Sequence, residues 1–348
     1  MEVTSNNISV DIEEVAFHTL SDTVVFPIYF WIYFTFTMFS QISVLLLVIF
    51  RTPPFFKDFR IFLVNSSFLQ IIMCCIVVFT QVRPISNHNS VGYLFSGVCR
   101  LVHKNACFFS FDVFQLVFDA SAFAIPVTLF YKYSKVTNMN GKDLSRFRVK
   151  LILISSYFLS VIVGVIYVIT YSPDESLDVS SETKKQHSSQ YDFSRYAEVT
   201  GYQNHIWSSL TNYLNMTSVY IPPIMSVIFI RLIQMKLNSL KHLFTDKTAA
   251  QARKFDLALT IQTLVPAVCV IPIYTLHLFL EHYDFQFLPD FEKILYMMLA
   301  LPTAIDAFIV IITITPYRTA FLSFFVCCEK PPPPVLRRVN NSVATSLF

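Results

Sequence analysis

The sequence alternates between long apolar stretches and short polar segments. Seven apolar stretches can be counted: Val24–Phe50, Ile61–Val82, Ala106–Tyr131, Leu151–Tyr171, Trp207–Ile233, Leu257–Leu280 and Ile294–Thr315. Each is long enough to cross a bilayer core of about 30 Å as an α-helix, which rises about 1.5 Å per residue. Helices also satisfy their own backbone hydrogen bonds in lipid. The pattern therefore predicts an all-α membrane protein with a bundle of seven transmembrane helices.

The third apolar stretch contains two acidic residues. Asp112, Gln115 and Asp119 follow one another at i, i+3 and i+7, so they share one stripe of the predicted helix. Because an acid facing lipid costs several kcal/mol, this stripe must face other helices or trapped water. The two acids are either structural hydrogen-bond anchors or part of a site inside the bundle, and two on one face favour the site.

Composition narrows the class of protein further. The chain is 54% hydrophobic and 14% charged, whereas ordinary soluble domains are about 25% charged. Its five glycines form no Gly-rich phosphate loop, and its seven cysteines form no C-x-x-C pair and no zinc-type Cys/His set. No cofactor, metal or nucleic-acid partner is expected.

Basic residues predict the orientation in the membrane. Of the 26 lysines and arginines, 19 fall on the side of the first loop and the C-terminus, and 7 fall on the other side. Excess Lys and Arg marks the cytoplasmic side, so we expect the N-terminus outside and the C-terminus inside. The expected parts are an extracellular tail (1–22), a transmembrane domain with a short interfacial helix (23–326) and a cytoplasmic tail (327–348). Asn7 begins an N-glycosylation sequon in the outer tail.

The cysteines of the outer side leave one question open. The longest outer loop, Pro173–Ile206, contains no cysteine, so no disulfide can tie it to the third helix. Cys99 and Cys107 are candidates for a local bridge. In a regular helix their Cα atoms would be about 12 Å apart, beyond disulfide reach. A bridge therefore requires a non-helical segment between them.

Polar side chains also recur at similar depth in the inner half of five helices. They are Gln41, Asn65, Gln70, Asp119, Gln262 and Asp306. Such groups pair with one another or with water inside a bundle. They are either structural hydrogen bonds or a network that rearranges when a ligand binds. Prolines in helices three, five, six and seven free backbone carbonyls and supply kinks.

The segment after the seventh helix has its own pattern. Pro316 is expected to end that helix, because proline lacks an N–H group. Thr319–Val326 is apolar but too short to span, which is typical of a helix lying in the membrane interface. Cys327 and Cys328 follow and are either palmitoylation sites or free thiols. The Pro331–Pro334 run predicts a disordered tail beyond it.

Three motifs resemble the nematode serpentine chemoreceptors, most closely class delta. They are TPPFFKDFRIFLVNSSFLQ from Thr52, FYKYSKV after helix three, and Asp306 with Thr315-Pro316-Tyr317-Arg318. Their order and spacing extend over about residues 24–325. Lys132 stands where the family more often has arginine, Ala307 stands where it often has proline, and the neighbouring class h shares the P-Y-R motif.

The resemblance implies a chemosensory G-protein-coupled receptor in the plasma membrane of sensory cilia. Its partners would be a small environmental molecule, a heterotrimeric G protein and membrane lipid. We expect ligand-binding residues in the outer half, namely Phe111, Asp112, Gln115 and His277. A basic inner surface would face the G protein or anionic lipid through Lys132, Arg146, Arg148, Lys236, Arg253, Lys254 and Arg318.

Two other classes of function are alternatives to a receptor. An ion- or proton-coupled transporter or channel would use Asp112, Asp119 and Asp306 as ion sites, but the sequence shows neither repeated halves nor Gly-interrupted helices. A membrane enzyme would need a catalytic motif, and neither G-x-S-x-G nor H-E-x-x-H occurs. The sequence favours a receptor.

Overall fold

The computed structural model describes residues 24–52, 59–87, 90–137, 146–170, 173–188, 191–197, 199–203, 206–239, 246–282 and 289–325. The helices are α2 (Phe26–Arg51), α3 (Phe59–Thr80), α4 (Lys104–Thr137), α5 (Arg146–Ser155), α6 (Phe158–Thr170), α7 (Pro173–His187), α8 (Ile206–Ser239), α9 (Asp246–His282), α10 (Pro289–Thr313) and α11 (Thr315–Phe325). The strands are β1 (Val82–Ser86), β2 (Ser90–Phe95) and β3 (Thr200–Gln203), and two short 3-10 helices are η3 (Val98–Leu101) and η4 (Phe193–Arg195).

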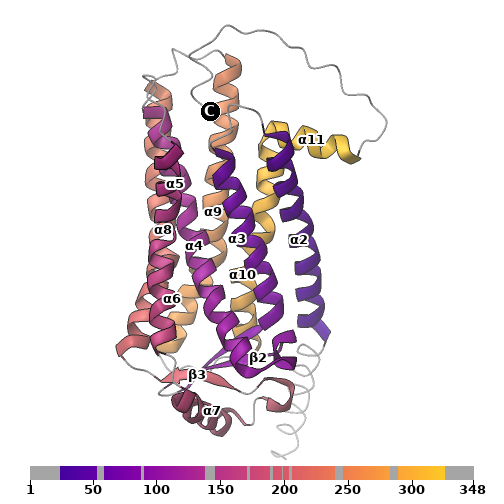
Figure 1. The fold of residues 1–348 in the computed structure, drawn as a ribbon, viewed down its shortest axis with the longest axis vertical. Helices are drawn as coiled ribbons and strands as arrows, with labels where there is room; N and C mark the ends of the chain where they lie inside the picture. Colours follow the sequence, from indigo (N-terminus) through magenta and orange to yellow (C-terminus); the bar gives the residue numbers. More distant parts are fainter. Residues whose placement is uncertain are drawn as a thin grey trace, which may run out of the picture.

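Seven spans among the described residues are long and apolar enough to cross a membrane, as the sequence pattern predicts. They stand side by side along the long axis of the molecule (Figure 1). Their outward surfaces carry large apolar side chains, including Trp31, Ile32 and Phe158, which are 58%, 65% and 70% exposed. A soluble protein would bury such side chains, whereas lipid accepts them. The structure is therefore that of a multi-pass membrane bundle.

The fourth span is two helices, not one. The Ser156 amide donates to the Leu153 carbonyl (3.1 Å) and the Tyr157 amide donates to the Ile154 carbonyl (3.0 Å). This i to i−3 spacing tightens the turn between α5 and α6. The Tyr157 hydroxyl then donates to Asn65 Oδ1 on α3. Tyr157, at the break between α5 and α6, thus connects the fourth span to α3.

The fifth and sixth helices are longer than their apolar stretches. The stretches predicted helices of 27 residues (207–233) and 24 residues (257–280), whereas α8 has 34 residues and α9 has 37. Both helices continue through internal prolines, two in each helix. Apolar counting detects only the part of a helix that contacts lipid or core, so polar extensions beyond the bilayer are missed.

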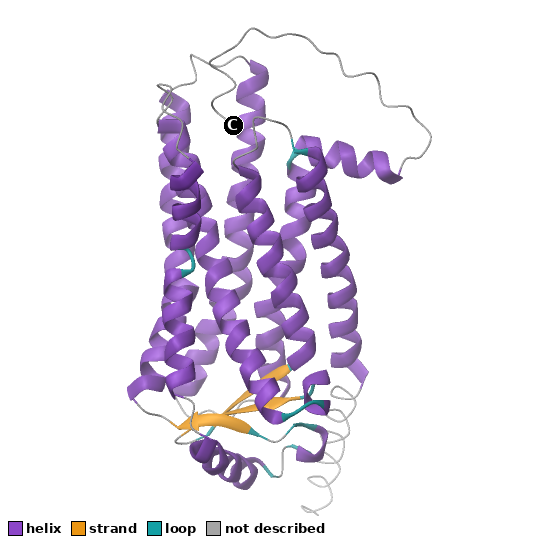
Figure 2. Cartoon of the chain, viewed as in Figure 1, coloured by secondary structure: helices purple, strands orange, loops and turns teal. Residues whose placement is uncertain are grey.

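One end of the bundle carries a small antiparallel sheet and a polar helix (Figure 2). We call β1, β2, β3 and α7 the cap. Strand β2 pairs with both other strands, with Val82 opposite Phe95 and Gly92 opposite Gly201. A Cβ atom on Gly201 would lie 2.1 Å from the Val91 carbonyl oxygen and 2.8 Å from Val179 Cγ1. Only glycine therefore lets β3 pass between β2 and α7.

The predicted polar loop from 173 to 206 thus contains regular structure. Helix α7 begins with proline, has acidic residues directly after it and ends with Lys184, Lys185 and His187. This order of charges complements the helix dipole, and proline suits the first turn of a helix. No disulfide connects this segment to α4 within the described residues. Pairing between β2 and β3 holds it instead.

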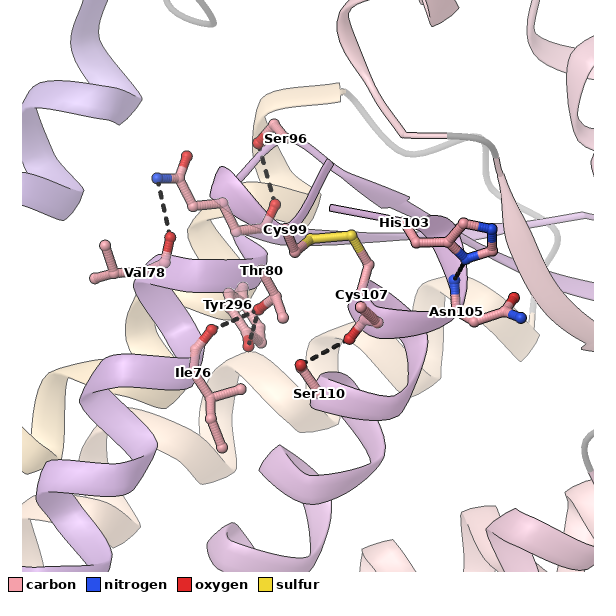
Figure 3. Close-up of a disulfide and its surroundings, with 12 residues drawn as sticks. Ile76, Val78, Thr80, Ser96, Cys99, His103, Asn105, Cys107, Ser110 and Tyr296 are labelled. Atoms are coloured by element: carbon pink, nitrogen blue, oxygen red, sulfur yellow. Dashed lines mark hydrogen bonds between the residues drawn. A yellow bond between two sulfur atoms is a disulfide. The ribbon is translucent and has the colours of Figure 1, made fainter. Parts of the chain in front are cut away.

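Cys99 and Cys107 form a disulfide with a Cα–Cα distance of 5.1 Å (Figure 3). The two cysteines do not share a regular helix, because Cys99 belongs to η3 and α4 begins only at Lys104. This result decides the question that the sequence left open. The Gly97 amide also donates to the Thr80 carbonyl (3.1 Å), and a Cβ on Gly97 would lie 2.2 Å from the Phe79 carbonyl oxygen. Helix η3 is therefore held against the end of α3.

The opposite end of the bundle carries α11, which runs across the bundle axis (Figure 1). The prediction that Pro316 ends the seventh helix was wrong in detail. Helix α10 already ends at Thr313, and Pro316 lies in the first turn of α11, where a missing N–H group costs nothing. Tyr317 is only 2% exposed, and its hydroxyl bonds with Thr52 Oγ1 (2.9 Å). Burial raises the pKa of Tyr317.

Candidate functional site

A cavity of about 390 Å³ lies between the helices and the cap. It is lined by Val82, Pro84, Ser86, Val91, Tyr93, Phe111, Phe114, Gln115, Phe118, Tyr202, Ser209, Asn212, Tyr213, Asn215, Met216, Val219, Tyr274, His277, Leu278, Leu295, Tyr296 and Leu299. Helices α4, α8, α9 and α10 form its walls, and all three strands contribute side chains. We call it the main cavity. Its size and concave shape are typical of small-molecule sites.

Aromatic side chains dominate the walls of the main cavity. The Tyr93 ring lies 4.6 Å from Phe111, and Phe111 stacks on Phe114 with centroids 6.2 Å apart. The Tyr93 and Tyr202 hydroxyls bond with each other (2.9 Å), and Tyr202 also donates weakly to Asn212 Oδ1 (3.4 Å). These bonds tie β2, β3 and α8 together around the cavity.

Three of the four side chains expected to bind a ligand line the main cavity. Phe111, Gln115 and His277 do, but Asp112 does not. Residues three and four apart share a helix face, so Phe111 and Gln115 point together, whereas Asp112 is rotated by about 100° from Phe111. Asp112 is buried, and its Oδ1 has no hydrogen-bond partner among the described residues.

Sequence reasoning missed the contributions of α8 and the cap. Asn212 and Asn215 lie one turn apart on α8, and Tyr93 and Tyr202 come from strands. Two asparagines at i and i+3 share a helix face, and this spacing is the signal in the sequence that could have indicated them. The strand residues offered no such signal, because their position depends on the pairing of distant segments.

A second cavity, of about 110 Å³, adjoins the first toward α11. Phe118, Val219 and Leu299 line both cavities. The second cavity also contains Gln70, Gln262 and Asp306, together with four prolines from α8, α9 and α10, namely Pro222, Pro223, Pro266 and Pro302. The two cavities are therefore separated by side chains and not by a helix.

A hydrogen-bonded chain of polar side chains connects four helices beside the second cavity. Gln41 Nε2 on α2 donates to Gln70 Oε1 on α3 and to the Thr303 carbonyl on α10 (2.7 Å). Gln70 Nε2 donates to Asp306 Oδ2, and Gln262 Nε2 on α9 donates to Asp306 Oδ1, both at 2.7 Å. Both oxygens of the carboxylate are thus held by amides. We call this chain the amide network.

Two other residues of the expected network lie apart from it. Asn65 bonds to Tyr157, and its Nδ2 is buried with no partner among the described residues. Asp119 is fully buried, and neither carboxylate oxygen has a hydrogen-bond partner there. The Ser218 hydroxyl on α8 donates to the Leu214 carbonyl (3.3 Å). Asn65 and Asp119 were expected in the network because they lie at a similar depth in the membrane. They lie on other faces of their helices and therefore do not join it.

Residues 26–323 match the family described as "Serpentine type 7TM GPCR chemoreceptor Srd". The chain belongs to this family. It is 68% identical over 291 residues to serpentine receptor class delta-34 of Caenorhabditis elegans, which covers 82% of this chain and 97% of the relative. Class delta-51 and delta-40 of the same organism are 26% and 25% identical over 82% and 84% of this chain, and over 83% and 89% of their own lengths. The class delta resemblance is confirmed.

The basic residues expected on the inner surface of this Srd receptor differ in exposure. Arg148 and Arg318 are exposed, Lys236 is half-buried, and Lys132 is buried at 8%. The side chains of Arg146, Arg253 and Lys254 lie outside the described residues, as do Asn7, Cys327 and Cys328. Because it is buried, Lys132 is poorly placed for direct contact with a partner protein.

A buried ionic cluster attaches the cap side of the receptor to α10. Arg83 on β1 is 1% exposed, and its Nε lies 3.8 Å from Glu292 Oε2. The Tyr191 hydroxyl donates to the same oxygen (2.7 Å), and Arg83 Nη1 donates to the Tyr196 hydroxyl (3.1 Å). The guanidinium also lies 5.1 Å from the centre of the Tyr191 ring. Burial and the Glu292 carboxylate raise the pKa of Tyr191.

Proposed function

We propose that this chemoreceptor binds a small environmental molecule in the main cavity and signals to a heterotrimeric G protein at the α11 end. The observation that supports this most directly is a cavity of about 390 Å³ that is lined by four spanning helices and by the strands of the cap. With the family resemblance, it favours an orientation with the cap outside and α11 in the cytoplasm. The receptor would then lie in the plasma membrane, in sensory cilia by family resemblance.

The arrangement of the two cavities suggests how binding reaches the inner end. A ligand in the main cavity touches Leu299 on α10 and Phe118 on α4, and both side chains also line the second cavity. The amide network there joins α10 to α2, α3 and α9. A ligand that binds more tightly to one helix arrangement shifts the population toward it. Repacking around Asp306 would transmit that shift.

At the α11 end, we propose that exposed basic side chains contact the G protein or anionic lipid headgroups. Arg148 on α5 and Arg318 on α11 are exposed, and Lys236 lies near the end of α8. Positive charge at a cytoplasmic surface attracts anionic lipid as well as a partner. Arg148 and Arg318 are therefore better candidates than Lys132, which is buried.

The proposal is tested in cells that lack other chemoreceptors, with a library of small organic compounds and a G-protein readout. For any compound that activates the wild type, Met216→Trp should lower potency by about tenfold or more, because Met216 lines the main cavity. Met225→Trp is the matched control, since Met225 lies on the same helix and is 37% exposed. Equal potency of the two variants at equal surface expression would contradict the proposed site.

Two modifications complete the proposal, and both fall outside the described residues. Asn7 would carry glycan if the N-terminus is outside, and a glycosidase should then increase the electrophoretic mobility of wild type but not of Asn7→Gln.

Cys327 and Cys328 would be palmitoylated beside the interfacial helix. Acyl-exchange labelling should exceed background in wild type and fall in the Cys327→Ser, Cys328→Ser double variant.

A further inference from the structure

The walls of the main cavity also restrict the chemistry of what it binds. Resting on the proposed function of this cavity, we propose that the ligand is an uncharged molecule with a flat, ring-containing body and one hydrogen-bonding group outside the ring. The group would be a hydroxyl or carbonyl placed at the edge formed by Gln115, Asn212 and Asn215. Three features of the walls carry this inference.

The first feature is the absence of charge. No Asp, Glu, Lys or Arg occurs among the described side chains that line the main cavity. The acid nearest along α4, Asp112, is not part of the lining, and Arg83 is buried against Glu292 and two tyrosines. Burying an ionised group without a partner costs several kcal/mol. A charged ligand would pay that cost in full, whereas an uncharged ligand would not.

The second feature is a polar edge made of amides. Gln115 lines the cavity from α4, Asn212 and Asn215 line it from α8, and these two helices pack against each other. The Gln115 amide makes no hydrogen bond with another described residue, so its N–H groups and its carbonyl are available to a ligand. An amide both donates and accepts, which matches a hydroxyl or a carbonyl equally well. A pure hydrocarbon would leave the Gln115 amide without a partner among the described residues.

The third feature is the aromatic lining. Phe111, Phe114 and Phe118 follow one face of α4, and tyrosines from α8, α9, α10 and two strands complete the walls. Aromatic rings pack face or edge against another ring with centroids about 4.5–7 Å apart. Such rings also attract cations, but that attraction is weaker than the cost of burying the charge.

The binding test uses four indoles that differ only in the end group: indole-3-ethanol, tryptamine, indole-3-acetate and 3-ethylindole. Purified full-length receptor in lipid nanodiscs is titrated with each, and affinity is taken from the shift of the unfolding midpoint. We expect indole-3-ethanol to bind about tenfold more tightly than each of the other three. Equal or tighter binding of tryptamine or indole-3-acetate, or no binding of indole-3-ethanol, would overturn the inference.

A charge variant separates this inference from the proposed function. Gln115→Glu places a carboxylate in the cavity at nearly constant volume and should reverse the preference toward tryptamine by about tenfold. Gln186→Glu makes the same change on the exposed surface of α7 and should alter nothing. If wild type prefers a charged indole and Gln115→Glu still changes the preference, the ligand class is wrong but the site stands. If Gln115→Glu and Gln186→Glu have the same effect on binding, the main cavity is not the binding site.

Discussion

Asp306 shows how one buried acid can be accommodated by neutral partners. Each of its oxygens accepts one glutamine N–H group at 2.7 Å. Gln41 on α2 fixes the orientation of the Gln70 amide. Because Gln41 donates to Gln70 Oε1, Gln70 Nε2 faces Asp306. Gln262 has no such constraint among the bonds described and can rotate its amide by 180°. The two sides of the carboxylate are therefore not equivalent.

This asymmetry predicts different outcomes for two substitutions of Asp306. Asp306→Asn should be mildly destabilising, because a flipped Gln262 can accept from the new Nδ2 while Gln70 still donates to Oδ1. Asp306→Leu should cost more, about 2–4 kcal/mol, because it removes the carboxylate that accepts from both Gln70 and Gln262 inside the bundle. The measurement is the thermal unfolding midpoint of purified receptor, with Asp178→Asn on the exposed face of α7 as control. Equal losses for both variants would show that the amide network adds little stability.

At the scale of elements, the connection from α3 to α4 depends on one covalent bond and one backbone contact. The disulfide closes a short loop between η3 and α4, and Gly97 presses η3 against the end of α3. Gln81, which follows α3, has a positive φ of 41°, a conformation that reverses the chain after the helix. The chain then continues as β1 and β2, which form a hairpin at the cap end of the bundle. These constraints position the hairpin beside the main cavity.

Breaking the disulfide should therefore loosen the hairpin. By loop entropy, a closed loop of about eight residues is worth about 2–3 kcal/mol. Cys99→Ser, Cys107→Ser and the double variant should each lower the unfolding midpoint by about the same amount, because each removes the same bond once. Cys75→Ser, at an exposed free cysteine, is the control. Additive losses in the double variant would indicate that the two side chains act independently.

What could be predicted from the sequence differs between elements for physical reasons. The spanning helices were predictable because lipid demands about 20 apolar residues, a signal that each helix carries by itself. The three-stranded sheet was not, because Ser90–Tyr93 of β2 pairs with Thr200–Gln203 of β3 across more than a hundred residues. Helix α7 was also missed, because its sequence is polar and only its charge order indicates a helix. In the candidate site, Phe111 and Gln115 were found from one helix, whereas Tyr202 requires the sheet.

For the whole molecule, the two ends of the bundle differ in kind. One end is closed by the cap and holds the disulfide, and the other carries α11 and the exposed Arg148 and Arg318. Disulfides form in compartments that are oxidising, such as the outer surface of a cell. The distribution of Lys and Arg along the sequence favours the same orientation. Both arguments support the proposed orientation, with the cap outside.

The orientation can be measured directly on intact cells. An epitope tag before Met1 should be labelled by an antibody without permeabilisation, and a tag after Phe348 should be labelled only after it. A cytosolic marker protein that stays unlabelled serves as the control for membrane integrity. The reverse labelling pattern would place α11 outside and would contradict the receptor mechanism proposed above.

The buried contact between Arg83 and Glu292 has a consequence for timing. If the proposed ligand enters the main cavity between β1 and α10, it must wait until these two elements separate, and it must wait equally to leave. If that separation is the slow step, the contact lengthens arrival and residence time by the same factor, about tenfold for each 1.4 kcal/mol. Affinity would stay unchanged while the signal outlasted the stimulus. A weaker contact would give a receptor that follows rapid changes in concentration, at the same threshold.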